Sequence, residues 1–143
     1  MTTFLFWNIN GKPLQDLLAR LVHAHHVDVL ILAECEIRPE LLLECFNQHG
    51  GPLFHFPRSS CEQIKIFVRF SRSYLVPTYE GPRISIRRLA LPARTEILLV
   101  AVHFPSKLFW SDDDQAFECT VLADQVARQE RAAGHTRTLL VGD

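Results

Sequence analysis

The sequence lacks the features typical of a membrane protein or of a small disulfide-linked scaffold. No apolar run approaches the ~20 residues of a membrane-spanning helix. The segment from Met1 to Phe6 is too short for the apolar core of a signal peptide. The four cysteines form no CxxC pair and have no zinc-type spacing. We therefore expect reduced thiols and a cytoplasmic protein.

The sequence also has little net charge and none of the composition of a disordered chain. Lys and Arg number 15 and Asp and Glu number 16, so the formal net charge is −1. This balance provides no overall attraction to nucleic acid or to a membrane. Hydrophobic residues make up 48% of the 143 residues, which suits a single domain with its own core.

Charge is nevertheless distributed unevenly along the chain. Residues 65–94 hold seven basic side chains and one acidic one, a net charge of +6. Residues 1–64 hold four basic and seven acidic side chains (net −3), and residues 95–143 hold four and eight (net −4). The cationic segment could be a solvated strand face with edge-protecting arginines. It could instead be a surface that receives phosphates, with the candidate contacts Arg83, Arg87 and Arg88.

Alternating strand and helix patterns predict an α/β protein. The helical spacing of apolar residues predicts three helices, and the last begins with a capping-box pattern at Ser111 and Asp114 and ends at Gly134. Because no helix separates the middle strands, we expect a mixed β-sheet flanked by helices. The predicted helices cover residues 13–22, 39–48 and 111–133, and the predicted strands residues 3–9, 27–33, 64–70, 83–89, 96–103 and 137–141.

Four polar side chains lie at, or just beyond, the carboxyl ends of apolar strands. They are Asn8, Glu34, His103 and Asp143. In open α/β sheets this edge is where ligands bind. Each residue also has an ordinary explanation: a turn asparagine, a solvent-facing carboxylate, a structural histidine and a strand terminus. Four such residues on one edge favour a single site, provided that the strands are neighbours.

These side chains suit metal-assisted attack on a phosphate ester. Carboxylate oxygens are the ligands that Mg²⁺ prefers, with Mn²⁺ as an alternative. An asparagine can orient a phosphate or an attacking water, and a histidine can bind a phosphate oxygen or transfer a proton. No zinc motif, P-loop or GxSxG elbow competes for the assignment. The acidic run from Asp112 to Asp114 lies in a predicted first helical turn, where we interpret it as structural.

Four segments resemble, in order, the motifs of the endonuclease/exonuclease/phosphatase superfamily, the DNase I-like phosphoesterases. FLFWNIN resembles the family's Trp-Asn-Ile strand, DVLILAE its Asp-Val-x-x-x-x-Glu strand, VAVHFPSK its His strand and loop, and TLLVGD its Gly-Asp-Phe-Asn strand. The resemblance implies that Glu34 is a metal ligand and that Asn8 assists phosphate or metal binding. It also implies that His103 contacts the scissile phosphate and that Asp143 orients or deprotonates the attacking water.

The resemblance makes residues 1–143 the N-terminal part of a single domain, in a sandwich of two sheets flanked by helices. The Phe-Asn that follows the family's Gly-Asp and its later Asp-His pair are absent, and Ala33 stands where a Gln is usual. We therefore expect a second polypeptide or a C-terminal fragment to complete the fold, and the isolated chain to be inactive. Without it, an inner sheet face would be exposed, with Leu30, Leu32, Leu98 and Val100.

We expect a Mg²⁺-dependent phosphodiester hydrolase, specifically a DNA or RNA nuclease, because the +6 segment suits a polyanion. Phosphoinositide and sphingolipid head groups are also family substrates and stay open. The alternative from another class is a non-catalytic nucleic-acid-binding or scaffold subunit of a complex. Lys107, beside Phe109 and Trp110, is a further candidate substrate contact, although aromatic residues there could equally pack in a core or interface.

Overall fold

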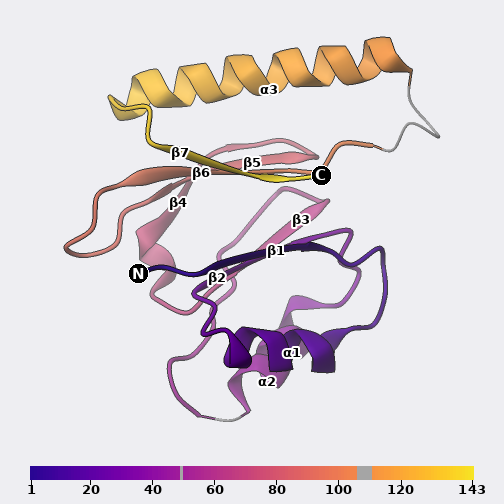
Figure 1. Ribbon diagram of the computed structural model, residues 1–143, viewed down its shortest axis with the longest axis vertical. Coiled ribbons are helices and arrows are strands. Elements are labelled where there is room, and N and C mark those ends of the chain that lie inside the picture. Colours follow the sequence, from indigo (N-terminus) through magenta and orange to yellow (C-terminus); the bar gives the residue numbers. More distant parts are fainter. Residues whose placement is uncertain (49, 106–110) are drawn as a thin grey trace.

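The structure is a computed structural model that describes residues 1–48, 50–105 and 111–143. Its strands form two mixed sheets that stack on each other, with helices on both outer sides (Figure 1). The first sheet has the order β1-β2-β3 and the second β4-β5-β6-β7. The strands are β1 (Phe4–Asn8), β2 (Val29–Ala33), β3 (Ile64–Val68), β4 (Leu75–Glu80), β5 (Ile84–Leu89), β6 (Ile97–Val102) and β7 (Thr138–Gly142).

The first sheet is covered on its outer face by two short helices, α1 (Gln15–Ala24) and α2 (Pro39–Asn47). The β2 strand pairs with β1 in parallel and with β3 antiparallel. Every β2 residue is buried, as its continuous apolar sequence VLILA predicts for a strand covered on both faces. Leu30 and Leu32 share an apolar cluster with residues of the two helices, among them Leu18, Leu42 and Phe46.

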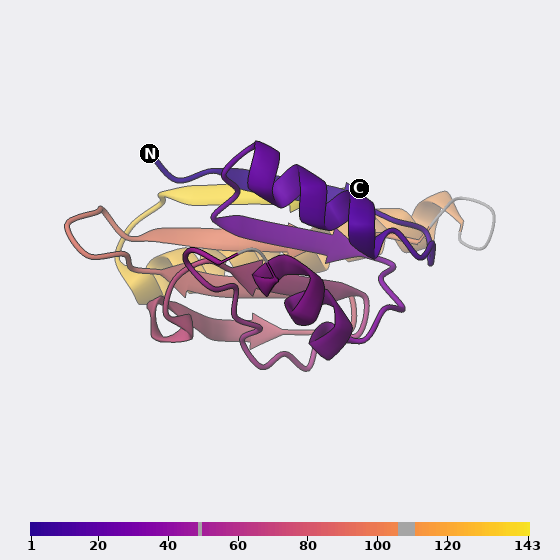
Figure 2. The ribbon, with the colours of Figure 1, turned by 90° about the horizontal axis from the view of Figure 1, so that it is seen from below.

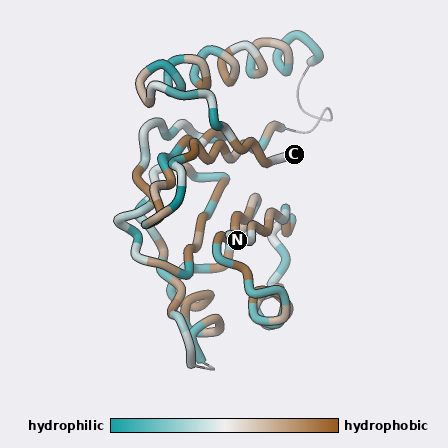
Figure 3. The backbone as a smooth tube through the Cα atoms, turned by 60° about the vertical axis from the view of Figure 1, so that its left-hand side comes forward, coloured by the Kyte–Doolittle hydropathy of each residue, from teal (hydrophilic) through white to brown (hydrophobic). Residues whose placement is uncertain are grey.

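The second sheet is an antiparallel meander of β4, β5 and β6, to which β7 is added in parallel. The long helix α3 (Asp112–Ala133) connects β6 to β7 and lies over the outer face of this sheet (Figure 1). The other face packs against the first sheet. Figure 3 shows apolar residues concentrated in the strands of both sheets. The layer between the sheets includes Val29, Ile31, Val68, Leu75, Leu99 and Ala101, all buried.

The α3 helix has the boundaries and both end signals that the sequence predicts. The Ser111 hydroxyl accepts a hydrogen bond from the Asp114 backbone N–H, and the Asp114 carboxylate accepts one from the Ser111 N–H. Gly134 ends the helix in the left-handed conformation, at φ +73°, which a glycine adopts without steric cost. Val121, Leu122 and Val126 pack onto the sheet.

The prediction of an exposed inner sheet face is wrong. Leu30, Leu32, Leu98 and Val100 are all fully buried within this chain. The two sheets cover each other's inner faces, and the three helices cover the outer ones, with Val100 packed in the cluster under α3. The burial of these residues therefore gives no argument for a second polypeptide that covers a sheet face in the described part of the chain.

What the described part of the chain does leave open is an edge of each sheet. β1 ends the order of the first sheet and β7 that of the second. The two strands lie on the same side of the molecule, as the views of Figures 1 and 2 agree. Every β1 residue is only partly buried, and Leu140 of β7 is 51% exposed. On α3, which covers this second sheet, Phe117 is 65% exposed.

The predicted helices and strands correspond to observed ones, and their two mixed sheets form the sandwich that the resemblance implies. The strand β4 was not predicted. Its sequence LVPTYE contains Pro77, which interrupts a strand pattern but is compatible with the edge position that β4 holds. None of the described helices is both long enough and apolar enough to cross a membrane.

Candidate active site

The four predicted site residues come from two pairs of parallel strands. β1 and β2 are parallel neighbours, so Asn8 and Glu34 lie at the same end of the first sheet. β6 and β7 are parallel neighbours in the second sheet, which brings His103 and Asp143 together, one residue beyond the paired Val102 and Gly142. The two sheets stack on each other, and this stacking brings the Asn8–Glu34 end of the first sheet against the His103–Asp143 end of the second. Strand pairing within either sheet would not do so.

Polar contacts link the four side chains in a closed ring. The Asn8 Nδ2 donates to Glu34 Oε1 at 3.0 Å and to Asp143 Oδ2 at 2.8 Å. The His103 Nε2 lies 3.0 Å from Glu34 Oε1, and its Nδ1 lies 2.8 Å from Asp143 Oδ1. The structure therefore brings all four predicted residues together in one site, and two of the four contacts cross from one sheet to the other.

His103 is the buried member of this ring. Its side chain is 9% exposed, against 35% for Glu34 and 45% for Asp143. Both ring nitrogens face carboxylate oxygens, so both can donate at once only when the imidazole is protonated. Backbone hydrogen bonds fix its place, from the His103 N–H to the Arg83 carbonyl at 3.0 Å and from the Phe104 N–H to the Asp143 carbonyl at 2.9 Å.

Glu34 has an unusual backbone conformation. Its φ is +47°, in the left-handed region that residues other than glycine seldom occupy. Two backbone hydrogen bonds hold it there: its N–H donates to the Gln63 carbonyl, and its carbonyl accepts from the Gly11 N–H. Strained backbone of this kind persists where the surroundings over-determine it, and it is concentrated at functional sites.

Gly142 permits the close approach that positions Asp143. A Cβ built on Gly142 would lie 2.1 Å from the Val102 carbonyl oxygen. Any side chain at this position would push β7 away from β6 and carry Asp143 with it. The glycine of the Gly-Asp pair is therefore explained by sterics at the strand end.

The donor set fits Mg²⁺ better than a metal held entirely by protein. Among the residues that the structure describes, no group of three or more His, Cys, Asp or Glu side chains converges as a ligand set. Mg²⁺ is held by one or two carboxylates, with waters and substrate phosphates completing its shell. Glu34 uses one oxygen, Oε1, for both of its ring contacts, so its carboxylate has a second oxygen with which it could bind a cation.

The neighbouring thiol of Cys35 is not part of this donor set. Burial raises the pKa of Cys35, and the opposing influences of the Lys65 charge and a hydrogen bond to the Ile37 carbonyl do not cancel it. The side chain is therefore a neutral thiol near pH 7, whereas a metal-binding cysteine is a thiolate.

The three arginines proposed as one phosphate-binding surface lie in three different environments. Arg83 is half-buried and adjoins the site through its carbonyl, which accepts from His103. Arg88 pairs across the sheet with Leu98, near the opposite end of β5 from Ile84, and its guanidinium binds Glu96 at 2.7 and 3.0 Å. The length of β5 therefore separates Arg83 from Arg88, and a substrate surface shared by the two stays a prediction.

Arg87 does not lie on an exposed strand face, which a polyanion-binding surface would require. Its side chain is 0% exposed and forms a buried ion pair with Glu80. The strand alternation does place Arg87 opposite Ile84 and Ile86, but the face on which it lies is turned toward the other sheet rather than toward solvent. Lys107, together with Phe109 and Trp110, lies outside the described residues.

Sequence reasoning missed the groups that hold the site residues in place. They are the Gln63 carbonyl and the Gly11 N–H on Glu34, and the Arg83 carbonyl on His103. The only signal for any of them was the turn pair Asn10-Gly11, both residues of which have positive φ. Backbone carbonyls carry no such signal, because every residue has one.

Comparison with known proteins gives a match only at the level of three-dimensional structure. No protein-family model matches the chain, and no curated protein matches it. Among solved structures, an endonuclease/exonuclease/phosphatase family protein from Leptotrichia buccalis C-1013-b superposes with a TM-score of 0.61 at 16% identity. The chain has a DNase I-like fold. The resemblance inferred from the four motifs is thereby confirmed for the fold.

Three further solved structures superpose with TM-scores between 0.59 and 0.71. The mannosyl-6-phosphatase Bt3783 of Bacteroides thetaiotaomicron VPI-5482 matches with a TM-score of 0.71 at 13% identity, over 100% of this chain and 65% of that one. TDP2 from Caenorhabditis elegans matches with a TM-score of 0.63 at 15% identity, over 99% of this chain and 46% of that one. The endonuclease domain of TRAS1, a telomere-specific non-LTR retrotransposon, matches with a TM-score of 0.59 at 18% identity, over 100% of this chain and 58% of that one.

The chain is shorter than the proteins it matches. It covers 46% to 66% of the length of these four neighbours, while almost all of its own residues are aligned. The neighbours include an endonuclease domain and a phosphatase, so this fold serves phosphate-ester chemistry in them.

Proposed function

We propose that this chain forms part of a divalent-metal-dependent phosphodiester hydrolase that acts on nucleic acid. The observation that carries the proposal is the closed ring of Asn8, Glu34, His103 and Asp143, assembled at the carboxyl ends of four strands. Mg²⁺, or Mn²⁺ in its place, would supply positive charge that polarises the phosphate and stabilises the charge developing on it.

Each ring member has a role that its contacts support. Glu34 is the metal ligand, presented by a strained turn at the edge of the site. Asn8 donates to both carboxylates through one nitrogen, so it fixes their separation without adding charge. Asp143, the most exposed of the three titratable members, orients the attacking water and accepts its proton.

His103 acts on the phosphate through one of its two nitrogens. Its Nδ1 is held by Asp143 at 2.8 Å, which orients the ring. Its Nε2 faces Glu34, and it can reach a phosphate oxygen when it exchanges the Glu34 carboxylate for that oxygen. A histidine that donates to the phosphate stabilises the negative charge of the transition state.

Nucleic acid is the substrate class that we favour. One neighbour is TDP2 of D. rerio in complex with a single-stranded DNA product, and another is an endonuclease domain. Arg83, whose backbone carbonyl accepts a hydrogen bond from the His103 N–H, is the basic residue that we propose as a phosphate contact beside the ring. A phosphomonoester is the alternative suggested by the phosphatase neighbour, and the choice of DNA or RNA stays open.

We further propose that activity requires a completing segment, supplied either by a second polypeptide or by a continuation of this one. The neighbours are longer than this chain, and its β1 and β7 strands are open edges on the same side, next to the ring. An added strand would satisfy the backbone groups of such an edge. The exposed Leu140 of β7 is an apolar contact for it.

The test compares residues 1–143 alone with the protein purified from its native cells, any copurifying polypeptide being identified by mass spectrometry. Labelled single-stranded DNA, RNA and a phosphomonoester are incubated with Mg²⁺ and, separately, with EDTA. We expect the native protein to cleave an oligonucleotide only with Mg²⁺, and Glu34→Gln to abolish cleavage. Arg88→Gln, an exposed arginine far from the ring, is the matched control.

Cleavage that persists in EDTA or in Glu34→Gln would contradict the proposed mechanism. Oligonucleotide binding without cleavage by the native protein would favour the non-catalytic scaffold. Full activity of residues 1–143 alone would refute the requirement for a completing segment while leaving the hydrolase itself supported.

A further inference from the structure

A second polar cluster lies at the β4 edge of the molecule, at the side of the second sheet opposite β7. A cavity of about 320 Å³ opens there, lined by Pro57, Arg58, Arg72, Leu75, Pro77 and Arg87. Three of these six lining residues are arginines, and none is acidic. The strand order β4-β5-β6-β7 separates the cavity from the ring, whose members follow β6 and β7 in this sheet.

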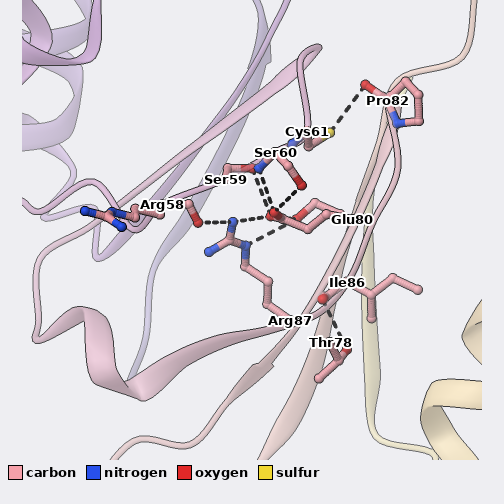
Figure 4. Close-up of polar contacts among 10 residues, drawn as sticks. Arg58, Ser59, Ser60, Cys61, Thr78, Glu80, Pro82, Ile86 and Arg87 are labelled. Carbon is pink, nitrogen blue, oxygen red and sulfur yellow. Dashed lines mark hydrogen bonds and ion pairs between the residues drawn. The ribbon is translucent and has the colours of Figure 1, made fainter.

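Arg87 is one of the lining residues of this cavity, and Figure 4 shows its guanidinium held by Glu80 and by the Arg58 carbonyl. Its Nε donates to the Ser85 hydroxyl at 3.2 Å, and its Nη2 donates to the Arg58 carbonyl at 3.0 Å and to the Glu80 carboxylate. Its Nη1 is buried and has no hydrogen-bond partner among the described residues. Buried polar groups in proteins are nearly always hydrogen-bonded. An Nη1 without an acceptor is therefore unusual, and it could donate to a bound ligand.

Glu80 neutralises Arg87 and is itself held tightly. Burial raises the pKa of Glu80, but hydrogen bonds from the Ser60 N–H and the Ser59 hydroxyl, together with the Arg87 charge, outweigh it and leave that pKa below its ordinary value. The carboxylate is therefore ionised near pH 7. The Arg87–Glu80 pair then contributes no net charge, and the cavity keeps the two charges of Arg58 and Arg72.

These observations define the chemistry of a ligand. It needs an oxygen acceptor narrow enough to approach Arg87 Nη1, and a charge near −2 to balance Arg58 and Arg72. A terminal phosphoryl group has both properties, with a charge of about −1.5 to −2 at pH 7 and three acceptor oxygens. A diester within a polymer backbone has a single negative charge and no free end to insert. The volume is at the lower limit of small-molecule sites, ~300–1,000 Å³.

We propose that this cavity is a second anion site, which binds free phosphate or the phosphoryl group of a small phosphate monoester. Arg58 and Arg72 are exposed and attract the dianion at the entrance, whereas Arg87 donates from the cavity wall. Arginine forks bind phosphate oxygens through several parallel N–H donors, which favours phosphate over a singly charged anion. Occupancy would provide the missing acceptor for Nη1 and tie β4 and β5 to the segment before β3.

The test uses residues 1–143 in EDTA, with inorganic phosphate and glucose 6-phosphate as the two probes. Binding is measured by calorimetry and by the NMR signals of the arginine Nε–Hε groups. The Arg87 side chain is buried, so its signal reports on the cavity. We expect saturable 1:1 binding that shifts the Arg87 signal. Arg58→Gln combined with Arg72→Gln is expected to weaken it by about tenfold or more, because two charged donors are lost.

Two control variants separate this site from the ring and from general charge effects. Arg88→Gln removes an exposed arginine of the same sheet and is expected to leave phosphate binding unchanged. His103→Ala alters the ring, and we expect the Arg87 signal of this variant still to shift when phosphate is added. Preference for inorganic phosphate or for glucose 6-phosphate identifies the source of the phosphoryl group, and either supports the site.

Three results would overturn the proposal. The first is an Arg87 signal that does not respond to either probe, which would mean that the cavity holds only water. The second is phosphate binding that survives the double arginine variant but is lost in His103→Ala. The third is a response to an unphosphorylated oligonucleotide equal to that for phosphate, which would make the cavity part of a nucleic-acid surface.

Discussion

The two polar clusters of this molecule differ in how far their charged side chains are exposed to solvent. The ring of Asn8, Glu34, His103 and Asp143 lies at strand ends, and its carboxylates are 35% and 45% exposed. The cluster around Arg87 lies within strands between the two sheets, where Arg87 is 0% and Glu80 11% exposed. The first can exchange its internal contacts for a substrate, whereas the Arg87–Glu80 ion pair is enclosed by protein and holds the sheets together.

This difference separates function from stability. A partly exposed ring loses little when one contact is removed, because water replaces it. A buried ion pair loses much, because removal of one partner leaves an uncompensated charge in the interior. Substitutions in the ring should therefore affect catalysis, and substitutions in the Arg87 cluster should affect folding.

The largest expected effect comes from breaking the ring at His103. In the native protein, His103→Ala should lower kcat for oligonucleotide cleavage by roughly 10²–10⁴-fold, the usual contribution of a positioned acid–base group. The free energy of unfolding, measured with urea on residues 1–143, should change far less than it does in a variant of the buried Arg87–Glu80 pair. Loss of folding together with activity would contradict the assignment of His103 to catalysis, and Arg88→Gln is the control.

Breaking the buried cluster should have the reverse effect. Glu80→Ala leaves Arg87 buried without its counter-charge, which costs about 3–5 kcal/mol. Urea unfolding of residues 1–143 measures this directly. The double variant Glu80→Leu with Arg87→Met should recover part of the loss, because an apolar pair of similar size carries no charge to desolvate. A double variant that is less stable than Glu80→Ala alone would refute this account.

The pH dependence of stability should reveal the same cluster. The pKa of Glu80 is lower in the folded protein than its ordinary value. Its contribution is therefore fully present above the unfolded pKa of ~4.3 and is lost as the pH falls through the folded pKa. Urea midpoints between pH 3 and pH 6 should fall more steeply for the wild type than for Glu80→Gln. Parallel curves would exclude Glu80 as the cause.

The smallest expected effects compare Arg83 with Arg88. Arg83→Gln should weaken oligonucleotide binding by the native protein and reduce its salt slope by about 1, as expected for one lost phosphate contact. Arg88→Gln should alter neither, and it should leave the free energy of unfolding almost unchanged, since its pair with Glu96 is exposed to solvent. If the two variants weaken oligonucleotide binding equally, Arg83 and Arg88 belong to one cationic binding surface.

Much of the secondary structure was predictable because local signals carried it. The continuous apolar run of β2 indicated a strand covered on both faces, and Ser111, Asp114 and Gly134 marked the two ends of α3. β4 was missed because Pro77 interrupts its pattern and only its edge position makes that proline acceptable. Leu30, Leu32, Leu98 and Val100 were expected to be exposed because the sequence did not show that strands of this chain alone form both sheets of the sandwich.

The sequence by itself determined which residue types end the apolar strands, and hence that Asn8, Glu34, His103 and Asp143 were the candidates for a site. Only the tertiary structure decided that they meet, because the Asn8–Asp143 and His103–Glu34 contacts cross between sheets whose stacking no local pattern specifies. It also decided that Arg87 is buried. Strand alternation fixes which face a side chain occupies, whereas the packing of other elements determines whether that face meets solvent or a second sheet.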